Sequence, residues 1–258
     1  MVNLLLIELA FIIIYMTVWY FIARALSRFD VADIAWGGGF IITALTAGVI
    51  SESLNPRAYL VMALVSIWGV RLSLHVYLRN RKKPEDTRYR AWRQEWGKHA
   101  NMRAFLQVFL LQGLLLLVIA LPASSVVMAG GKPFMVLDAI GVFLWITGFL
   151  FEAAGDWQLL HFKQNHSNKG KIISTGLWRY SRHPNYFGEV TLWWGIYLIA
   201  LAGGAGWATI IGPLTITFLI LRVSGIPMLE KKYEGNPEFE EYRKRTSAFF
   251  PLPPKQQQ

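Results

Sequence analysis

The chain has 258 residues, of which 54% are hydrophobic and 16% are charged, and its formal net charge at neutral pH is +10. A soluble domain carries about 25% charged residues, so this shortage of charge argues against a soluble domain and for membrane spans. Lysine and arginine cluster between the apolar runs, as in the cytoplasmic loops of membrane proteins, so nucleic acid is not the expected partner. The chain has no cysteine, which excludes disulfides and thiol chemistry.

Seven stretches of the sequence are apolar enough to span a membrane, for which a helix needs about 20 residues. The first stretch lacks a basic start and a small-residue cleavage site, so we expect a retained span and not a signal peptide. We therefore predict an all-α, polytopic membrane protein with seven transmembrane helices. In chain order, the predicted spans are Leu4–Ala25, Val31–Ile50, Ala58–Leu78, Phe105–Met128, Leu137–Phe162, Tyr186–Ala202 and Trp207–Ile226.

The loops between these spans differ in charge. Arg24 and Arg28 follow the first span, and residues 79–103, after the third, hold nine lysines or arginines against three acids. Basic segments also follow the fifth and seventh spans, whereas the alternate loops hold little beyond Arg57 and Lys132. By the positive-inside rule, the N-terminus is predicted to lie outside and the C-terminus in the cytoplasm.

Several common sites are absent from the sequence. It has no glycine-rich dinucleotide fingerprint after a strand and no phosphate-binding P-loop, so a nucleotide-binding fold of the soluble type is not expected. Its five histidines lack the spacing of metal ligands, so no metal site is predicted. No serine elbow supports nucleophilic hydrolysis.

The fifth span carries Glu152, Asp156 and Lys163, whose steps of four and seven residues place them on one helical face. Ionisable side chains at membrane depth are costly and are candidates for function by default. A helix end that meets water would account for Lys163, but Glu152 lies about two turns deeper. We therefore predict that this face belongs to a binding site.

A second polar face lies on the third span. Trp68, Arg71, His75 and Arg79 follow one another there at steps of three, four and four residues. Snorkelling to the membrane surface would account for Arg79, but it is less favourable for Arg71, about two turns further in. We predict that this face meets the substrate.

The second span begins with DVADIAWGGGF, which places Asp33 and Trp36 on one helical face. Its three glycines would let a helix or a planar ligand approach the backbone, and ordinary packing of small residues between membrane helices is the simpler explanation. Asp33 is a candidate for the site. Alternatively, it is only an acid in the first turn of the helix, where a negative charge interacts favourably with the helix dipole.

Residues 179–189 read RYSRHPNYFGE and gather polar groups at the edge of the sixth span. Proline is favoured at the first helical position, so Pro184 is expected to begin that helix. The polar side chains around the helix start are Arg182, His183, Asn185, Tyr186 and Glu189.

A helix N-terminus flanked by cations is a natural anion site. Asn185 and Glu189, stacked at i and i+4, would bind an amide or ribose hydroxyls inside it, as a dinucleotide requires. The alternative is an interfacial belt of aromatic residues, which explains Trp178 and Tyr180. Such a belt does not explain a carboxylate within the span.

The stretch GLWRYSRHPNYFGE, followed by a span and then by EKKYEGNPEFEEYRKRTSAFFP, resembles the C-terminal signature of membrane steroid 5-alpha-reductases and the related sterol C14-reductases. The first half of the chain is similar more loosely, through the span count and the YLRNRKKP end of the third span. The whole chain looks like a bacterial member of the 5-alpha-reductase-like branch, a multi-pass protein of the inner membrane.

This resemblance implies an NADPH-dependent oxidoreductase that reduces the carbon–carbon double bond of a 3-oxo-4-ene steroid or a similar enone. It implies one reductase domain over residues 1–258, with residues 1–104 on the substrate side and residues 105–258 as the cofactor-binding half. The substrate, an apolar steroid-like molecule, would enter from the lipid, and no protein partner is required. From the resemblance and the polar faces together, the expected cofactor-binding residues are Arg81, Lys83, Glu152, Asp156, Lys163, Trp178, Arg182, His183, Asn185, Tyr186, Glu189, Glu230, Tyr233 and Tyr242.

The catalytic residues follow less directly, because the sequence departs from the family there. The 5-alpha-reductases have a Gln–Glu pair in the second span and a tyrosine in the third, at the steroid carbonyl. The nearest candidates in this chain are Asp33, Trp36, Trp68, Arg71 and His75. A donor in a dry site would stabilise the charge that develops on the carbonyl oxygen, and the candidate donors are Asp33 in its neutral form, or Arg71 and His75 as cations.

Two other interpretations stay open. The RHPNY…E signature also resembles isoprenylcysteine carboxyl methyltransferases, which bind S-adenosylmethionine at a similar helix start. The seven spans, the polar face of the fifth span and the long third loop favour the reductase. The third interpretation is a non-catalytic lipid-binding or scaffold protein of the membrane, which would leave the buried polar faces without a purpose.

Overall fold

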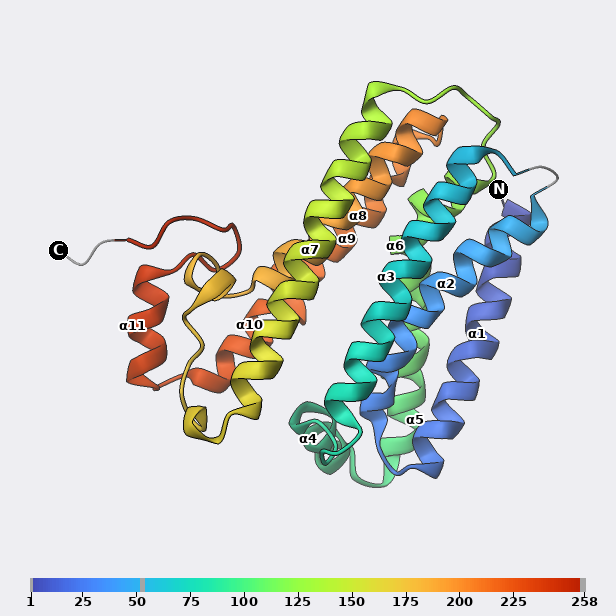
Figure 1. The fold of residues 1–258 in the computed structure, drawn as a ribbon. Coiled ribbons are helices and arrows are strands. Elements are labelled where there is room, and N and C mark those ends of the chain that lie inside the picture. Colours follow the sequence, from blue (N-terminus) through green and yellow to red (C-terminus); the bar gives the residue numbers. More distant parts are fainter. Residues whose placement is uncertain (1, 52–53, 256–258) are drawn as a thin grey trace. The chain divides into compact units, whose positions relative to one another are not determined.

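The computed structural model describes residues 2–51 and 54–255, and the regular structure within these ranges is helical (Figure 1). Six helical segments are long and apolar enough to cross a membrane, which indicates an integral membrane protein of the all-α class. These segments are Val2–Ala25, Phe29–Ile50, Pro56–Asn80, Thr87–Val127, Val136–Gln164 and Trp207–Tyr233.

The predicted spans all coincide with helical segments, but one of them is not among these six. The span predicted over Tyr186–Ala202 forms the helix α8 (Pro184–Gly203), which contains a glutamate, an asparagine and three glycines among its 20 residues. A count of seven spans and the orientation of the termini therefore stay predictions.

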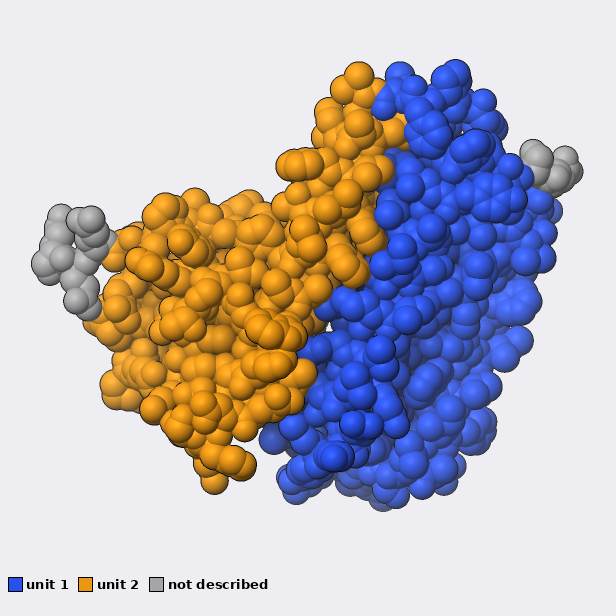
Figure 2. All heavy atoms as spheres, in the orientation of Figure 1, with its two compact units in different colours: residues 1–135, 199–212 blue, residues 136–198, 213–258 orange. Residues whose placement is uncertain are grey.

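The chain folds into two compact units, coloured separately in Figure 2. Unit 1 comprises Met1–Met135 and Ile199–Gly212, and unit 2 comprises Val136–Leu198 and Pro213–Gln258. The chain passes from one unit to the other within α8 and returns within α9 (Ile211–Phe218).

Unit 1 is built around a bundle of long helices. Its helices are α1 (Val2–Ala25), the 3-10 turn Phe29–Val31, α2 (Ala32–Ile50), α3 (Pro56–Asn80), α4 (Thr87–Trp96), α5 (Ala100–Ala104), the π-helical segment Phe105–Leu110 and α6 (Leu111–Val127). Helix α2 packs against α1, α3 and α6, so it lies at the centre of the bundle.

The glycines of α2 make this central position possible. A Cβ atom on Gly37 would overlap the backbone carbonyl of Gly69 in α3, and a Cβ atom on Gly39 would overlap the side chain of Leu116 in α6. Gly38 lies against the hydroxyl group of Tyr15 in α1. The simpler explanation of the three glycines, small-residue packing between membrane helices, is therefore the one that applies here.

Unit 2 contains two long helices and a set of short ones. They are α7 (Val136–Gln164), most of α8, most of α9, the π-helical segment Leu219–Val223, α10 (Ile226–Glu230) and α11 (Pro237–Arg245). Pro184 begins α8, as the sequence predicts. Helix α11 begins with Pro237 and is capped by Asn236, whose side chain accepts a hydrogen bond from the amide of Phe239.

Close packing of α7 on α8 positions the polar residues of unit 2. A Cβ atom on Gly148 would overlap the backbone of Gly188 and Leu192, and Gly155 lies against the backbone amide of Asn185. Only glycine allows two helix backbones to approach so closely. This approach brings the polar face of α7 to the first turn of α8.

Candidate functional site

The Arg182 cluster, defined here as Arg182, His183, Glu230 and Tyr242, lies in unit 2. Arg182 forms a two-point ion pair with Glu230, with Nε 2.9 Å from Oε1 and Nη2 3.2 Å from Oε2. The Nε2 atom of His183 lies 2.9 Å from the same Oε1 atom. Charge-assisted bonds of this two-point kind fix both partners in orientation.

The remaining nitrogen of Arg182 binds the C-terminal segment. Its Nη1 atom donates to the backbone carbonyls of Thr246, at 2.5 Å, and Arg243, at 3.2 Å. Every guanidinium nitrogen thus already has a protein acceptor. In this arrangement Arg182 fastens the segment after α11 to the start of α8, which is a role the sequence pattern did not suggest.

Tyr242 and Trp178 extend the cluster to α7. The Tyr242 hydroxyl donates to the backbone carbonyl of Trp178, and the indole Nε1 of Trp178 donates to the carbonyl of Gly155 at 3.1 Å. Burial raises the pKa of the Tyr242 hydroxyl, which therefore keeps its proton for this bond. The two aromatic residues join α11, the loop before α8 and α7.

Asp156 and Asn185, 29 residues apart in the chain, meet where α7 crosses α8. The Asn185 Nδ2 atom donates to Asp156 Oδ1 at 3.0 Å. No group within the described ranges donates to Asn185 Oδ1. The pair therefore presents an amide oxygen that is held in orientation and open to a donor.

The other predicted cofactor residues of unit 2 differ in burial and in their contacts. Glu152 is buried on α7 beside Gly188, and Glu189 is half-buried on α8. Tyr186 stacks on His183, with ring centroids 5.6 Å apart. Outside this group, Tyr233 stacks on Phe239, and Lys163 is exposed near the end of α7.

Unit 2 also contains a cavity of about 540 Å³ that the sequence pattern did not reveal. Three cationic side chains, three short hydroxyl side chains and the ring of Tyr242 line it. The lining includes Ser174, Thr175, Arg179, Tyr242, Arg245, Thr246 and Lys255. Of the three cations only Arg245 lies on an α-helix, so no helical spacing in the sequence points to this cavity.

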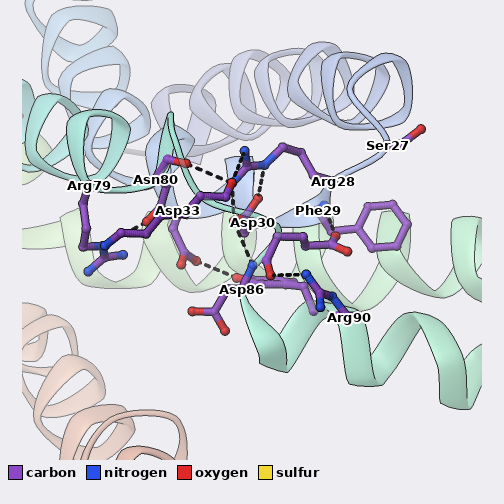
Figure 3. A network of polar contacts seen from close by, with 12 residues as sticks. Ser27, Arg28, Phe29, Asp30, Asp33, Arg79, Asn80, Asp86 and Arg90 are labelled. Carbon is purple, nitrogen blue, oxygen red and sulfur yellow. Dashed lines mark hydrogen bonds and ion pairs between the residues drawn. The ribbon is translucent and has the colours of Figure 1, made fainter. Parts of the chain in front are cut away.

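In unit 1, Asp33 belongs to a network of polar contacts (Figure 3). Its Oδ2 atom lies 3.2 Å from Nη2 of Arg88, and its Oδ1 atom accepts a hydrogen bond from the Tyr89 hydroxyl at 2.5 Å. Both carboxylate oxygens thus act as acceptors for protein groups. The amide of Gln112 donates to the Tyr89 oxygen at 3.4 Å, while the Gln112 Oε1 atom is buried without a partner among the described residues.

A second ion pair of this network fixes the segment between α3 and α4. Arg28 binds Asp30 through two bonds of 2.7 Å, and Asp30 accepts a hydrogen bond from the Asp86 amide at 3.1 Å. The hydrogen bond with Asp30 raises the pKa of Arg28 above its usual range. Glu85 accepts hydrogen bonds from the Phe29 amide at 2.6 Å and from Arg93 at 2.8 Å.

The sequence pattern placed Arg88 and Tyr89 in a basic loop and did not assign them a role. They lie in the short helix α4, which Asp86 caps by accepting from the amide of Arg88 at 2.9 Å. An aspartate just before a polar and aromatic run is a recognisable helix start. That signal would have found the helix, but not its contact with Asp33.

The remaining catalytic candidates lie on α2 and α3. The rings of Trp36 and Trp68 both pack edge-on against Phe40, at centroid distances of 5.3 and 5.2 Å, and Trp68 is fully buried. They form part of the aromatic core of unit 1. Arg71 and His75 are half-buried on α3.

Two cofactor-binding candidates also belong to unit 1. Arg81 and Lys83 are exposed in the segment after α3. The backbone carbonyl of Lys83 accepts a hydrogen bond from Arg28 Nη1 at 3.3 Å, so this segment is held to the network of Asp33. Their predicted role with the cofactor stays a prediction.

Comparisons with known proteins place most of the chain in one family. Residues 19–246 match the family model described as a protein of unknown function, DUF1295. An uncharacterized protein of Schizosaccharomyces pombe is 27% identical over 227 residues, which cover 77% of this chain and 65% of that protein. The chain therefore spans somewhat less than two thirds of that relative's length. No solved structure matches.

Proposed function

Because the chain belongs to the DUF1295 family, which is found in steroid 5-alpha-reductase-like proteins, we propose that it is a membrane reductase that uses NADPH. Its substrate would be a 3-oxo-4-ene steroid or a similar apolar enone, whose carbon–carbon double bond is reduced. The observation that carries this proposal is the hydrogen-bonded pair of Asp156 and Asn185 at the crossing of α7 and α8.

The residues of this pair fit one end of the cofactor. Asp156 accepts a hydrogen from Asn185 Nδ2, which leaves Asn185 Oδ1 to accept from an amide such as the nicotinamide carboxamide. NADPH, when bound, supplies the hydride. Asp156 acts in this proposal as a positioning residue, since it fixes the orientation of the Asn185 amide.

The proposed reaction also needs a donor for the enone carbonyl. A donor near the carbonyl oxygen stabilises the negative charge that develops there when hydride adds to the beta carbon. Both oxygens of Asp33 lie within bonding distance of Arg88 and Tyr89. We propose Arg71 or His75 on α3 as the donor, with neutral Asp33 as the alternative.

The cofactor of the competing methyltransferase interpretation is S-adenosylmethionine, which has no phosphate group and carries a positive sulfonium. The cationic cavity of unit 2, with Arg179, Arg245 and Lys255 in its lining, supports a phosphate-bearing cofactor instead. The methyltransferase reaction accordingly serves as the second arm of the test.

The test uses the full chain, purified in detergent, with NADPH and either progesterone or testosterone, and mass spectrometry of the products. A parallel reaction offers S-adenosylmethionine and a prenylated cysteine. We expect a steroid that has gained two hydrogens, with NADPH consumed, and loss of this product in Asn185→Ala. Lys244→Gln, a change of an exposed side chain on α11, is the matched control. A product that gains a methyl group instead would reject the reductase.

A further inference from the structure

The lining of the unit 2 cavity has an unusual balance of charge. It includes Arg179, Arg245 and Lys255 but no aspartate or glutamate. Like charges that face one space repel one another, and they cost free energy unless an anion enters or water screens them. The three cations are exposed, and the charge of the lining favours a negatively charged ligand.

Several of these polar groups have no partner in the protein. Within the described ranges, the guanidinium group of Arg179 and the Nζ atom of Lys255 form no hydrogen bond or ion pair. The hydroxyls of Ser174 and Thr175 are likewise without a partner there. Arg245 keeps only a contact of 3.5 Å with Glu241. The cavity thus offers a set of donors that the fold itself does not use.

The walls of the cavity are fixed before any ligand arrives. One wall precedes α8 and the other is the C-terminal segment, and a bridge between Ser181 and Ser247 ties them together. The amide of Leu252 donates to the Tyr180 carbonyl at 3.0 Å, and the amide of Lys255 donates to the Arg245 carbonyl at 3.0 Å. Arg182 joins the same two walls, because its Nη1 atom donates to the Arg243 and Thr246 carbonyls. A preformed site loses less entropy on binding than a mobile one.

We propose that this cavity binds a phosphoryl group. A phosphoryl group offers several acceptor oxygens and more than one negative charge, which suits guanidinium, ammonium and hydroxyl donors together. The volume of about 540 Å³ accommodates more than one phosphoryl group, as in a pyrophosphate or the phosphate-bearing end of a nucleotide. If the bound group is a phosphate of NADPH, the cavity is the phosphate subsite of the proposed cofactor. Only this identification rests on the proposed function.

A soluble nucleotide and an anionic lipid both carry this group, so the experiment separates the two sources. The full chain is placed in nanodiscs of phosphatidylcholine, which has no net charge, and titrated with inorganic pyrophosphate and with 2′,5′-ADP. Nanodiscs that contain phosphatidic acid form the second arm. If the natural ligand is a lipid, phosphatidic acid will displace pyrophosphate, and if it is a nucleotide, 2′,5′-ADP will bind more tightly than pyrophosphate.

The variants are Arg179→Gln and Lys255→Gln, alone and together, and the control is Lys244→Gln. Lys244 also lies in the C-terminal part of the chain but is outside the lining, with 76% of its side chain exposed. We expect each cavity variant to weaken binding of the phosphate probe about tenfold, because a charge-assisted bond is lost. The control should bind as the original protein does.

The results also separate this inference from the reductase proposal. Phosphate binding that depends on Arg179 and Lys255, in a protein that reduces no enone, supports the cavity and rejects the reductase. Enone reduction by NADPH with unchanged nucleotide affinity in the double variant supports the reductase and overturns the cavity inference. The cavity inference is also overturned if the double variant and the control bind all three probes equally, namely pyrophosphate, 2′,5′-ADP and phosphatidic acid.

Discussion

The two units each contain an arginine–carboxylate pair at a place where the sequence predicts function, yet the pairs differ in what surrounds them. Arg182 and Glu230 in unit 2 have 8% and 15% of their side chains exposed, and Arg88 and Asp33 in unit 1 have 22% and 21%. The deeper pair joins α8, α10 and the C-terminal segment, whereas the shallower pair joins α2 to α4.

This difference separates two uses of the same chemistry. In unit 2 the pair lies outside the lining of the cavity but holds its C-terminal wall, and two cations of the lining, Arg179 and Lys255, have no partner in the described ranges. In unit 1 Arg88 and Tyr89 contact both carboxylate oxygens of Asp33, one of the residues that the sequence offers as a proton donor. The pair in unit 2 thus supports a candidate ligand site, whereas the pair in unit 1 holds a candidate residue in place.

The largest effect that we expect comes from Arg182→Ala. The change removes every donor of a buried guanidinium and leaves Glu230 without its ion pair, which costs about 3–5 kcal/mol for a buried pair. Thermal unfolding of the purified protein in detergent would measure the loss. The control is Arg243→Ala, because the Arg243 side chain is 57% exposed and its ion pair with Glu240 contributes about 0–1 kcal/mol.

A double-mutant cycle with Glu230→Gln sharpens this result. If Arg182 acts mainly through Glu230, the two changes together should cost clearly less than their sum. Equal stability of Arg182→Ala and Arg243→Ala would contradict the assignment of Arg182 as the fastener of unit 2.

The second effect concerns unit 1. Asp33→Asn replaces a carboxylate that binds Arg88 and Tyr89, and the loss of a charged hydrogen bond costs about 1.5–3 kcal/mol. We expect a lower unfolding temperature with unchanged nucleotide affinity, since the variant alters no cofactor contact. Unchanged stability together with lost turnover would instead support Asp33 as a catalytic residue.

Most of the fold was predictable because membrane helices depend on apolar length, a property that can be read from local sequence. The starts of α2 and α8 follow from this length and from Pro184, and the six apolar segments match the predicted positions. Helix α4 was missed because its ten residues are mostly polar and its stability comes from contacts with α2 and the cap at Asp86. Contacts of that kind have no local signature.

The sequence offered candidate residues for the site, but not the contacts that they make in the fold. Spacing on α7 and the start of α8 brought out Asp156 and Asn185, which the structure joins by a hydrogen bond. The use of Arg182 could not be foreseen, because its acceptors lie about sixty residues later in the chain, at Arg243 and Thr246. The cavity lining was missed for the same reason, since two distant segments form it.

A smaller effect, on affinity, tests the membership of the site directly. Asn185→Ala removes the amide that Asp156 orients, and we expect nucleotide binding about tenfold weaker, as for the loss of one good polar contact. Asp156→Asn should weaken binding less, because Asn185 keeps its own oxygen but loses its fixed orientation. Fluorescence titration of NADPH would measure both, and equal affinities in both variants and the original protein would reject the site.

The smallest effect comes from Tyr242→Phe, which removes the hydrogen bond to the Trp178 carbonyl and should cost about 1 kcal/mol. This contribution depends on pH in a known direction. Burial raises the pKa of the Tyr242 hydroxyl in the folded protein, whereas the unfolded chain loses this proton at about pH 10. The folded state therefore holds the proton more tightly, and the stabilisation is complete below about pH 10 and declines as the pH rises above it.

The unfolding temperatures of the original protein and of Tyr242→Phe should accordingly differ at pH 8 and converge above about pH 10. The comparison of the two proteins cancels the titration of the other tyrosines and lysines, which both share. A difference that stays constant across this range would mean that the fold does not raise the pKa of the Tyr242 hydroxyl. Equal unfolding temperatures at pH 8 would mean that the link between α11 and the loop before α8 rests on packing of the Tyr242 ring and on Arg182 alone.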